Sequence, residues 1–549
     1  MSPSQRSSPQ LTLEALQLAF IWGSEARQQS QLVSLDLCNA CREAIPVRLI
    51  VTDHMPPSLS SMFFGTPTSQ RHNSVDTGSR ESLESHTKGG VAAFVYSPSP
   101  ADQPPRGQMG GAGAIIPDEQ GEKCRRRLAS YGRVSHVAWG ASRLSIRQVA
   151  SWPPGVLHLS FLEKFSQDLG PVLWPAGLRE LTIREGFNRP VEGIEFPFGL
   201  QKMSLGADFD QPIELAAFPP ALTFLSLGAS FNHPIAGAKW PHSLKRIVWG
   251  NLFDQPVEGM RWPAALESIA FGNSFNHSIE ESIFPTGLRS LLLGAAFNQP
   301  VEGVSWPPAI DTLSFGYQFN QPVAGMSWPR GLKEVSFGFS FNQPLGGVKW
   351  PPELESVVFG FRFNQPLDGD VTWPARCHAI QLGESFDLPL HDVRWPRGLL
   401  ELDLGDDYNR PLEGVSLPVG LERLYLSVFF NQPVVAVQWP AALLELDFGL
   451  NFNMPIEGAM FPRGLESVCF GRCFNQDVTR FSWPEGLLRV AFGRAFVGAL
   501  EGATWPPPKL LVLDLGSKHH AKHPIDESKL RDGCQVFYLY ARGGGNEDY

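Results

Sequence analysis

The sequence predicts an all-β solenoid of about 16–18 turns, in which short parallel strands stack with no regular helices in the repeats. Two observations carry this prediction. A 22-residue period runs through most of the chain, and a typical copy contains two prolines and two glycines. Proline in a helix interior costs about 3 kcal/mol and glycine about 1 kcal/mol, so such a repeat leaves no room for a stable α-helix. A solenoid also suits a chain of 549 residues, because each added turn needs only its neighbours.

The period is clearest in two adjacent copies. Trp306–Ser327 reads WPPAIDTLSFGYQFNQPVAGMS, and Trp328–Lys349 reads WPRGLKEVSFGFSFNQPLGGVK. The step from an aromatic residue or leucine to proline recurs 17 times between Trp152 and Pro506, with one added residue near Asp370. Self-similarity of this kind is the signature of a repeat architecture.

One stretch of each copy alternates apolar and polar residues, as in Leu332–Phe337. This alternation predicts a short strand with one buried face. Strands of successive turns should stack about 4.8 Å apart into a parallel sheet, as a rod roughly 75–80 Å long. A glycine follows the strand in most turns, and we expect a positive φ there, which glycine allows without a Cβ clash.

Two further columns should complete each turn. The phenylalanine three residues after the glycine, such as Phe319 or Phe341, should point inward and cap the core. The asparagine or aspartate that follows should satisfy backbone groups at a corner, because buried polar groups need partners. Aspartate can accept a hydrogen bond there as the amide oxygen does, but it cannot donate one.

The Trp-Pro steps allow two interpretations: an exposed aromatic ladder that binds carbohydrate, or a buried row on the back of the coil. Tryptophan is replaced in this column only by phenylalanine or leucine, at Phe196, Phe218, Phe284, Phe461 and Leu417. Exposed stacking sites rarely accept leucine, so the buried interpretation is favoured.

Composition argues against several classes of protein. The net charge is −10, the opposite of the basic footprint of a nucleic-acid binder. No apolar run approaches the roughly 20 residues that span a bilayer, and Glu14 interrupts the apolar segment Leu11–Trp22, so neither a membrane span nor a signal peptide is expected. Seven scattered cysteines favour a reducing compartment over a disulfide framework. We therefore expect a cytoplasmic monomer with no nucleic-acid or membrane partner.

The chain should divide into four parts. They are a small N-terminal segment, a disordered linker rich in Ser, Pro and Gly, the solenoid, and a C-terminal cap with a frayed tail, at residues 1–55, 56–123, 134–516 and 517–549. In the first part, Leu11–Ala26 could form an amphipathic helix and Ile45–Val51 a strand. A short apolar strand is expected at Val536–Tyr540 in the last part.

The repeats resemble FNIP repeats, a divergent form of leucine-rich repeat named for Phe-Asn-Ile-Pro. Phe319–Pro322 and Phe341–Pro344, both FNQP, carry the likeness, which covers Val134–Gly516 or about 70% of the chain. Glutamine in place of isoleucine, and Trp-Pro where the family often has Leu-Pro, depart from its pattern. The resemblance implies a leucine-rich-repeat-like interaction scaffold with no catalytic residues. Some members add an F-box or kinase domain, and neither signature is visible here.

The motifs that could carry chemistry are weak, so no catalytic, cofactor or metal site is predicted. Cys38 and Cys41 form a C-x-x-C without the two further ligands that zinc needs, and ordinary cysteines are favoured. A solvated basic patch is the simpler interpretation of His519, His520 and His523. Cys469 and Cys473 lie four residues apart, and no neighbouring turn supplies partners. P-loop, zincin and nucleophile-elbow motifs are absent.

Binding is instead expected on the outward strand positions, which core packing leaves free to vary. Strand alternation places five residues on the same side of the sheet, in an acidic patch with one aromatic ring: Glu401, Asp403, Tyr425, Glu445 and Asp447. We hypothesise that a basic region of a protein partner binds this patch; a solvated acidic face without a ligand is the alternative. Competing hypotheses for the whole chain are a carbohydrate-binding module that uses the Trp-Pro ladder and an F-box-like adaptor that uses the N-terminal segment.

Overall fold

The computed structural model describes residues 48–52, 93–96, 135–140, 146, 152, 155–161, 165–500, 504–516 and 530–539. It divides into two compact units, Met1–Leu162 and Glu163–Tyr549. The helix expected at Leu11–Ala26 lies outside the described residues.

In the first unit, the described residues form four strands that pair in parallel. β1 (Arg48–Thr52) pairs with β2 (Ala93–Tyr96) and with β3 (His136–Gly140), and β3 pairs with β4 (His158–Phe161). The strand expected at residues 45–51 overlaps β1. Within the stretch 56–123 the structure describes only β2, so disorder of that stretch stays a prediction.

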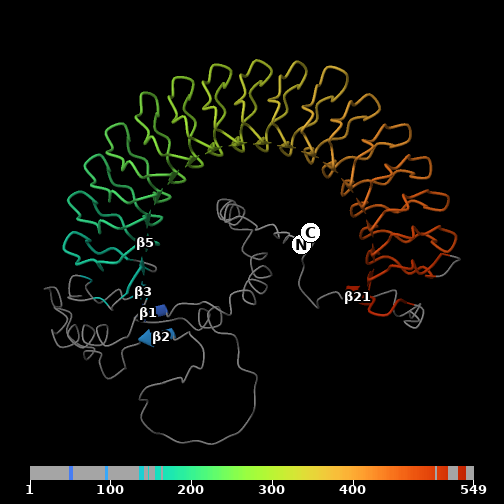
Figure 1. Cartoon of the computed structure of the whole chain (residues 1–549), viewed down its shortest axis with the longest axis horizontal. Helices are drawn as coiled ribbons and strands as arrows, with labels where there is room; N and C mark the ends of the chain where they lie inside the picture. The colour runs from blue at the N-terminus through green and yellow to red at the C-terminus, as the bar shows by residue number, and fades with distance from the viewer. Residues whose placement is uncertain are drawn as a thin grey trace, which may run out of the picture. The chain divides into compact units, whose positions relative to one another are not determined.

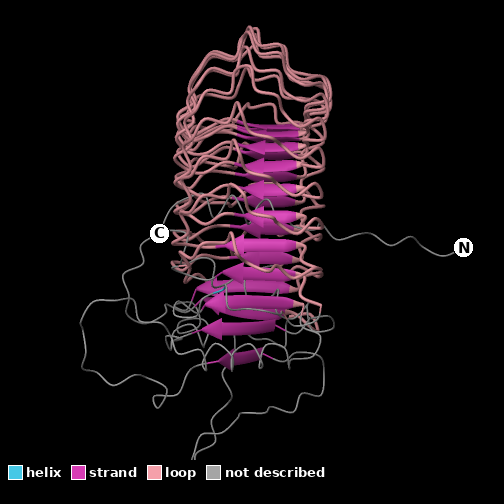
Figure 2. Ribbon diagram, turned by 90° about the vertical axis from the view of Figure 1, so that its left-hand side faces the viewer, coloured by secondary structure: helices cyan, strands magenta, loops and turns pink. Residues whose placement is uncertain are grey.

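The second unit contains 17 strands among its described residues, and they lie side by side in one sheet (Figure 2). They are β5 (Glu180–Ile183), β6 (Lys202–Ser204), β7 (Phe224–Ser226), β8 (Arg246–Val248), β9 (Ser268–Ala270), β10 (Ser290–Leu292), β11 (Thr312–Ser314), β12 (Glu334–Ser336), β13 (Ser356–Val358), β14 (Ala379–Gln381), β15 (Glu401–Asp403), β16 (Arg423–Tyr425), β17 (Glu445–Asp447), β18 (Ser467–Cys469), β19 (Arg489–Ala491), β20 (Val512–Gly516) and β21 (Gln535–Leu539).

Each of these strands pairs in parallel with the next, at the predicted period of 22 residues except between β13 and β14, β19 and β20, and β20 and β21, where the spacing is 23. Val335 of β12 lies opposite Val357 of β13, 22 residues later. Val357 in turn lies opposite Ile380 of β14, because the residue added near Asp370 lengthens that turn by one. The part of the chain that the structure describes contains no α-helix, and the predicted all-β solenoid is confirmed.

The core consists of columns of buried side chains that stack from turn to turn, and each turn contributes one residue to every column. The central residue of each three-residue strand points inward, as Leu313 does, and the phenylalanine column represented by Phe319 and Phe341 is fully buried. The rings of these two phenylalanines are parallel, with centroids 6.1 Å apart. Burial of each such side chain stabilises the fold by about 1.5–3 kcal/mol. The burial of these columns confirms the inward positions expected from the repeat.

The second unit is curved, with its strands on the inner side of the arc (Figure 1), and the expectation of a rod is therefore wrong. Paired strands lie about 4.8 Å apart. The aromatic rings behind them need more room: ring centroids are 6.1 Å apart at Phe319 and Phe341, and 5.9 Å apart at Trp350 and Trp373. Because the back of each turn is thicker than its strand, successive turns fan out around the sheet.

The asparagine column stabilises one corner as expected. The side-chain oxygen of Asn320 accepts the backbone N–H of Asn342, one turn later, at 2.9 Å. It also accepts from the side-chain amide of Gln343 at 3.1 Å. Asp254 accepts the backbone N–H of Asn276 in the same way, at 3.1 Å. An aspartate in this column therefore supplies the acceptor oxygen in place of the asparagine.

The glycines that follow the strands differ from expectation. A positive φ occurs at Gly405, Gly449 and Gly471, but the glycines of most turns do not adopt it. Glycine is required there for space. A Cβ on Gly316 would overlap the carbonyl oxygen of Gly294, the equivalent residue of the preceding turn. The column is therefore a line of close backbone contacts between turns.

Candidate binding face

The five residues predicted to form an acidic patch lie together on the inner side of the curved sheet. They occupy the outward positions of β15, β16 and β17, on either side of central leucines that point into the core. In the register of these strands, Asp403 lies opposite Tyr425, and Tyr425 lies opposite Asp447. The predicted grouping of these five positions therefore holds in three dimensions.

Arg423, which is not among the five predicted residues, lies in the middle of the patch. It is opposite Glu401 on one side and Glu445 on the other. Its Nε donates to Glu401 Oε2 at 2.9 Å, and its Nη2 lies 2.8 Å from the same oxygen. The hydrogen bond to Glu401 raises the pKa of the guanidinium, which stays charged. The 22-residue spacing from Glu401 could have revealed this neighbour.

Tyr425 presents a neutral phenol beside these charges. Its hydroxyl donates to Glu445 Oε2 at 3.4 Å. Burial, followed by the nearby carboxylates of Glu445 and Glu401, raises the pKa of Tyr425 to about 12. The ring is therefore available both for apolar contact and as a hydrogen-bonding group at neutral pH.

The two aspartates of the patch also stabilise the turns that follow them. Asp403 Oδ1 accepts the backbone N–H of Gly405 at 2.9 Å, and Asp447 Oδ1 accepts that of Gly449 at 2.8 Å. Burial raises the pKa of both carboxyls, against the lowering effect of these hydrogen bonds. One carboxylate oxygen of each aspartate thus stabilises the turn that follows its strand.

Three further carboxylates extend the negative charge beyond the predicted patch. Glu384, Asp406 and Asp407 lie in the loops that follow β14 and β15. Burial raises the pKa of Glu384, and the carboxylates of Asp406, Asp403 and Asp407 raise it further. No ion pair within the described part of the chain involves these three residues or Asp403. A negative field therefore surrounds the loop ends of β14 and β15.

The tryptophans do not form an exposed ladder. Every tryptophan of the Trp-Pro column is buried or half-buried. Trp328 packs edge-on against Phe337, with an interplanar angle of 85°. Its indole nitrogen is buried without a hydrogen-bond acceptor, as are seven others of the column: Trp262, Trp306, Trp350, Trp373, Trp395, Trp439 and Trp483. The buried interpretation is confirmed.

The other candidate residues form no chemical site that the structure describes. Cys469 is a free thiol whose pKa burial raises to about 11, and Cys473 is a separate, exposed thiol. Within the described ranges, no group of three or more His, Cys, Asp or Glu side chains could hold a metal ion. Cys38 and Cys41, like the histidines at 519, 520 and 523, lie outside those ranges.

The described residues include no helix of the length and hydropathy needed to cross a bilayer. The cytoplasmic location and the monomeric state expected from the sequence stay predictions.

Comparison with known proteins identifies the repeat. The family model described as FNIP Repeat matches residues 187–230, 297–340 and 408–451. Among solved structures, the circular leucine-rich-repeat protein CroV588 is similar, with 29% sequence identity and a TM-score of 0.64 over 74% of this chain. The match spans 59% of the length of CroV588.

Two other solved structures share less. A chain of the Toll–Spatzle complex from Drosophila has 14% identity and a TM-score of 0.44, over 67% of this chain and 56% of that one. An internalin (inlF) from Listeria monocytogenes has 14% identity and a TM-score of 0.30, over 64% and 84%. No curated protein matches this sequence.

Proposed function

Because the chain carries FNIP repeats folded as a leucine-rich-repeat-like solenoid, we propose that it is a non-catalytic scaffold whose inner sheet face binds a basic region of a protein partner. The observation that supports this most directly is the grouping of Glu401, Asp403, Tyr425, Glu445 and Asp447 on three adjacent strands.

The charges of the patch favour a cationic ligand. Arg423 offsets Glu401, with which it pairs, but Glu445, Asp403 and Asp447 remain on the same face. Complementary charge increases the rate of encounter and excludes wrong partners. Tyr425 lies between the two aspartates in the sheet register and offers the kind of aromatic side chain that dominates binding energies at interfaces.

Curvature supports the same face. The strands line the inner side of the arc (Figure 1), so outward residues of successive strands converge on a partner held inside the curve. Repeat proteins commonly use such extended concave surfaces for binding.

The test is a pull-down from native extract with the full chain as bait. The variant combines Glu401→Lys and Glu445→Lys with Tyr425→Ser and with Asp403→Asn and Asp447→Asn. The two asparagines keep the oxygens that accept from Gly405 and Gly449, so the turns should stay intact. We expect the partners recovered by the natural chain to be lost.

A matched control changes the net charge equally at exposed positions on the loops behind the sheet: Glu258→Lys, Glu302→Lys and Glu413→Lys. This control should recover the same partners as the natural chain. Unchanged recovery by the patch variant, with unchanged thermal unfolding, would exclude the patch as the binding site.

A further inference from the structure

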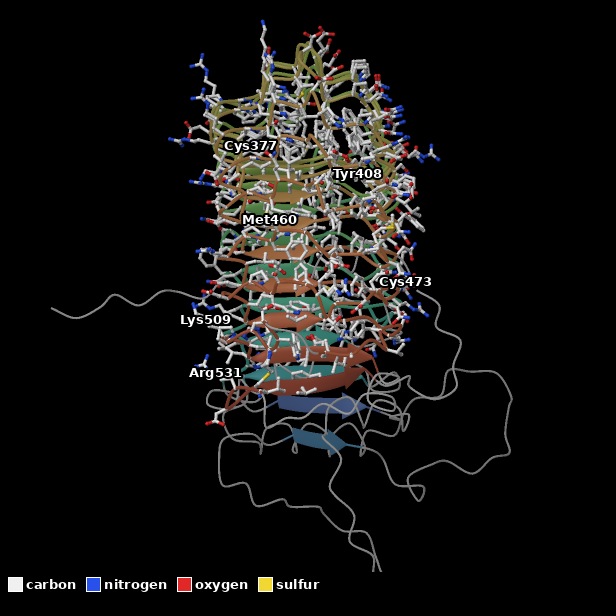
Figure 3. The ribbon with its side chains drawn as sticks, turned by 90° about the vertical axis from the view of Figure 1, so that its right-hand side faces the viewer. Cys377, Tyr408, Met460, Cys473, Lys509 and Arg531 are labelled. Carbon is white, nitrogen blue, oxygen red and sulfur yellow. The ribbon has the colours of Figure 1, made fainter. Side chains whose placement is uncertain are left out.

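A second surface row contains three stacked aromatic rings. Tyr317, Phe339 and Phe361 each follow the glycine after a strand, in three successive turns. Ring centroids are 4.4 Å apart between Tyr317 and Phe339 and 4.5 Å apart between Phe339 and Phe361, with interplanar angles of 9° and 17°. The row runs along the edge where the strands end, the side on which Cys473 lies in Figure 3.

Packing does not demand aromatic residues in this row. The equivalent position is Ala295 one turn earlier and Glu384 one turn later, and small, polar or charged residues occupy it in most other turns. Phe361 is 41% exposed, and the other two rings are half-buried. The three consecutive rings therefore form an apolar row on the surface, at a position where packing within the turn is satisfied by alanine.

The geometry of the stack limits what can bind it. Each ring covers the face of the next, and the guanidinium of Arg362 lies over Phe339 at 5.6 Å. Ring edges therefore face outward. Sugars bind aromatic side chains by stacking on their faces, so a row of edges is a poor carbohydrate platform. Apolar side chains, in contrast, pack well against ring edges.

Charge along the same row indicates what lies beside those apolar groups. The two turns after Phe361 carry Glu384 and Asp406 in the equivalent position. Burial raises the pKa of Glu384, and the carboxylates of Asp406, Asp403 and Asp407, which lie near it, raise that pKa further. The row thus changes from aromatic to acidic within five turns.

We propose that Tyr317, Phe339 and Phe361 dock an extended segment of a partner protein, in which apolar side chains are followed by lysine or arginine that meets Glu384 and Asp406. This deepens the proposed scaffold function, on which it rests. Successive turns of the solenoid lie about 5 Å apart, and an extended peptide advances about 3.3 Å per residue. Roughly four residues of the bound segment, including its apolar side chains, therefore span the three rings before its lysine or arginine residues begin.

Selection from a random 12-residue phage-displayed peptide library on the immobilised full chain tests this proposal. The enriched peptides should place two or more apolar side chains beside a basic pair. Synthetic copies with a fluorescent label should bind the natural chain, and Phe339→Ser with Phe361→Ser should weaken them by about tenfold or more in fluorescence anisotropy. Glu384→Lys with Asp406→Lys should weaken only peptides that contain the basic pair.

Phe198→Ser provides the control, because Phe198 is an isolated exposed phenylalanine, 79% accessible, outside the row. It should leave peptide binding unchanged. If the double variant is unstable in a thermal melt, peptide binding is measured with Phe361→Ser alone, because Phe361 is the most exposed ring of the stack.

Three outcomes would overturn the proposal: no enrichment, enriched peptides without the apolar-basic pattern, or binding that survives the row variants. If binding is instead lost only with the Glu401, Tyr425 and Glu445 changes, the row is excluded while the scaffold function stands. Glycan binding that is lost in the Phe339→Ser and Phe361→Ser variant would replace the peptide by a carbohydrate.

Discussion

Arg410 forms an ion pair with Asp387 of the preceding turn, with Nη2 2.9 Å from Asp387 Oδ2. Its Nε also donates to the backbone oxygen of Asp387, at 3.1 Å. In most turns these two positions hold glutamine and asparagine, as in Gln343 and Asn320, which bond through their amides. The acid of the column is thus matched by a base 23 residues later.

The same exchange occurs at both other aspartates of the column. Asp210 lies 3.3 Å from His233, and Asp254 lies 3.3 Å from His277. Wherever the asparagine becomes an acid, the glutamine of the next turn becomes histidine or arginine. In these three turns the column keeps its oxygen acceptor, and the residue 23 positions later places a side-chain nitrogen beside it.

This pairing predicts compensation between two substitutions. Asp387→Asn and Arg410→Gln should each lower the free energy of unfolding, whereas the double variant should approach the natural chain because it recreates an amide pair. The pair is partly exposed, so we expect a coupling of about 0.2–1 kcal/mol in a double-mutant cycle measured by urea unfolding. Strictly additive losses would contradict the pairing.

A buried hydroxyl predicts a stabilising substitution. Tyr408 replaces phenylalanine in the fully buried ring column, between Phe386 and Phe430, and its hydroxyl is buried without a hydrogen-bond partner. Burial raises the pKa of this phenol, which stays protonated. Tyr408→Phe should raise the free energy of unfolding by about 1 kcal/mol. The reciprocal change, Phe430→Tyr, should lower it by roughly 1–3 kcal/mol, and a gain there would disprove the argument.

The glycine column predicts a position-specific effect of one methyl group. Gly316→Ala would place its Cβ against the Gly294 carbonyl oxygen and should destabilise the fold by about 1–3 kcal/mol or more. Gly287→Ala is the matched control, because no atom lies within 4 Å of its Cβ position. The two midpoints of thermal unfolding should differ clearly; equal midpoints would show that the turns can separate.

The aspartates of the patch predict a pH dependence. Burial raises the folded-state pKa of Asp403 above its ordinary value of 3.8, so the folded state holds its proton more tightly than the unfolded chain. Stability is therefore lost as pH rises from below 3.8 through the folded pKa. Asp403→Asn keeps an oxygen acceptor for Gly405 and removes this penalty. Its advantage over the natural chain in urea unfolding should grow from acidic to neutral pH.

Asp477 provides the opposite case. Hydrogen bonds from the backbone and hydroxyl of Thr479 lower the pKa of Asp477, so its contribution is present above the ordinary value and lost at acid pH. Asp477→Asn should therefore lower the free energy of unfolding at pH 7 and leave it unchanged at acid pH. The same trend in both variants would contradict these environments.

Much of the fold was predictable because strand alternation and backbone preference within one turn decide which of its side chains are buried. Alternation around Val335 predicts which side chains are buried, and the burial of Phe319 follows from its place after the strand. Replacement of tryptophan by Leu417 identified the column as core. The five residues of the patch were found for the same reason, since strand alternation alone decides that they point outward.

That Arg423 lies beside Glu401 could also be predicted, but only by comparing equivalent positions of successive turns. The aromatic row at Tyr317, Phe339 and Phe361 was missed because it lies in a loop, where no alternation indicates which way a side chain points.

The sequence by itself determined the period, the parallel strands and the columns that face inward, because burial and backbone preference act within one turn. Only the tertiary structure decided the curvature, the close contact of Gly316 with Gly294, and the pairing of Asp387 with Arg410. These depend on distances between turns, where rings about 6 Å apart lie behind strands about 4.8 Å apart. No pattern along the chain contains that difference in thickness.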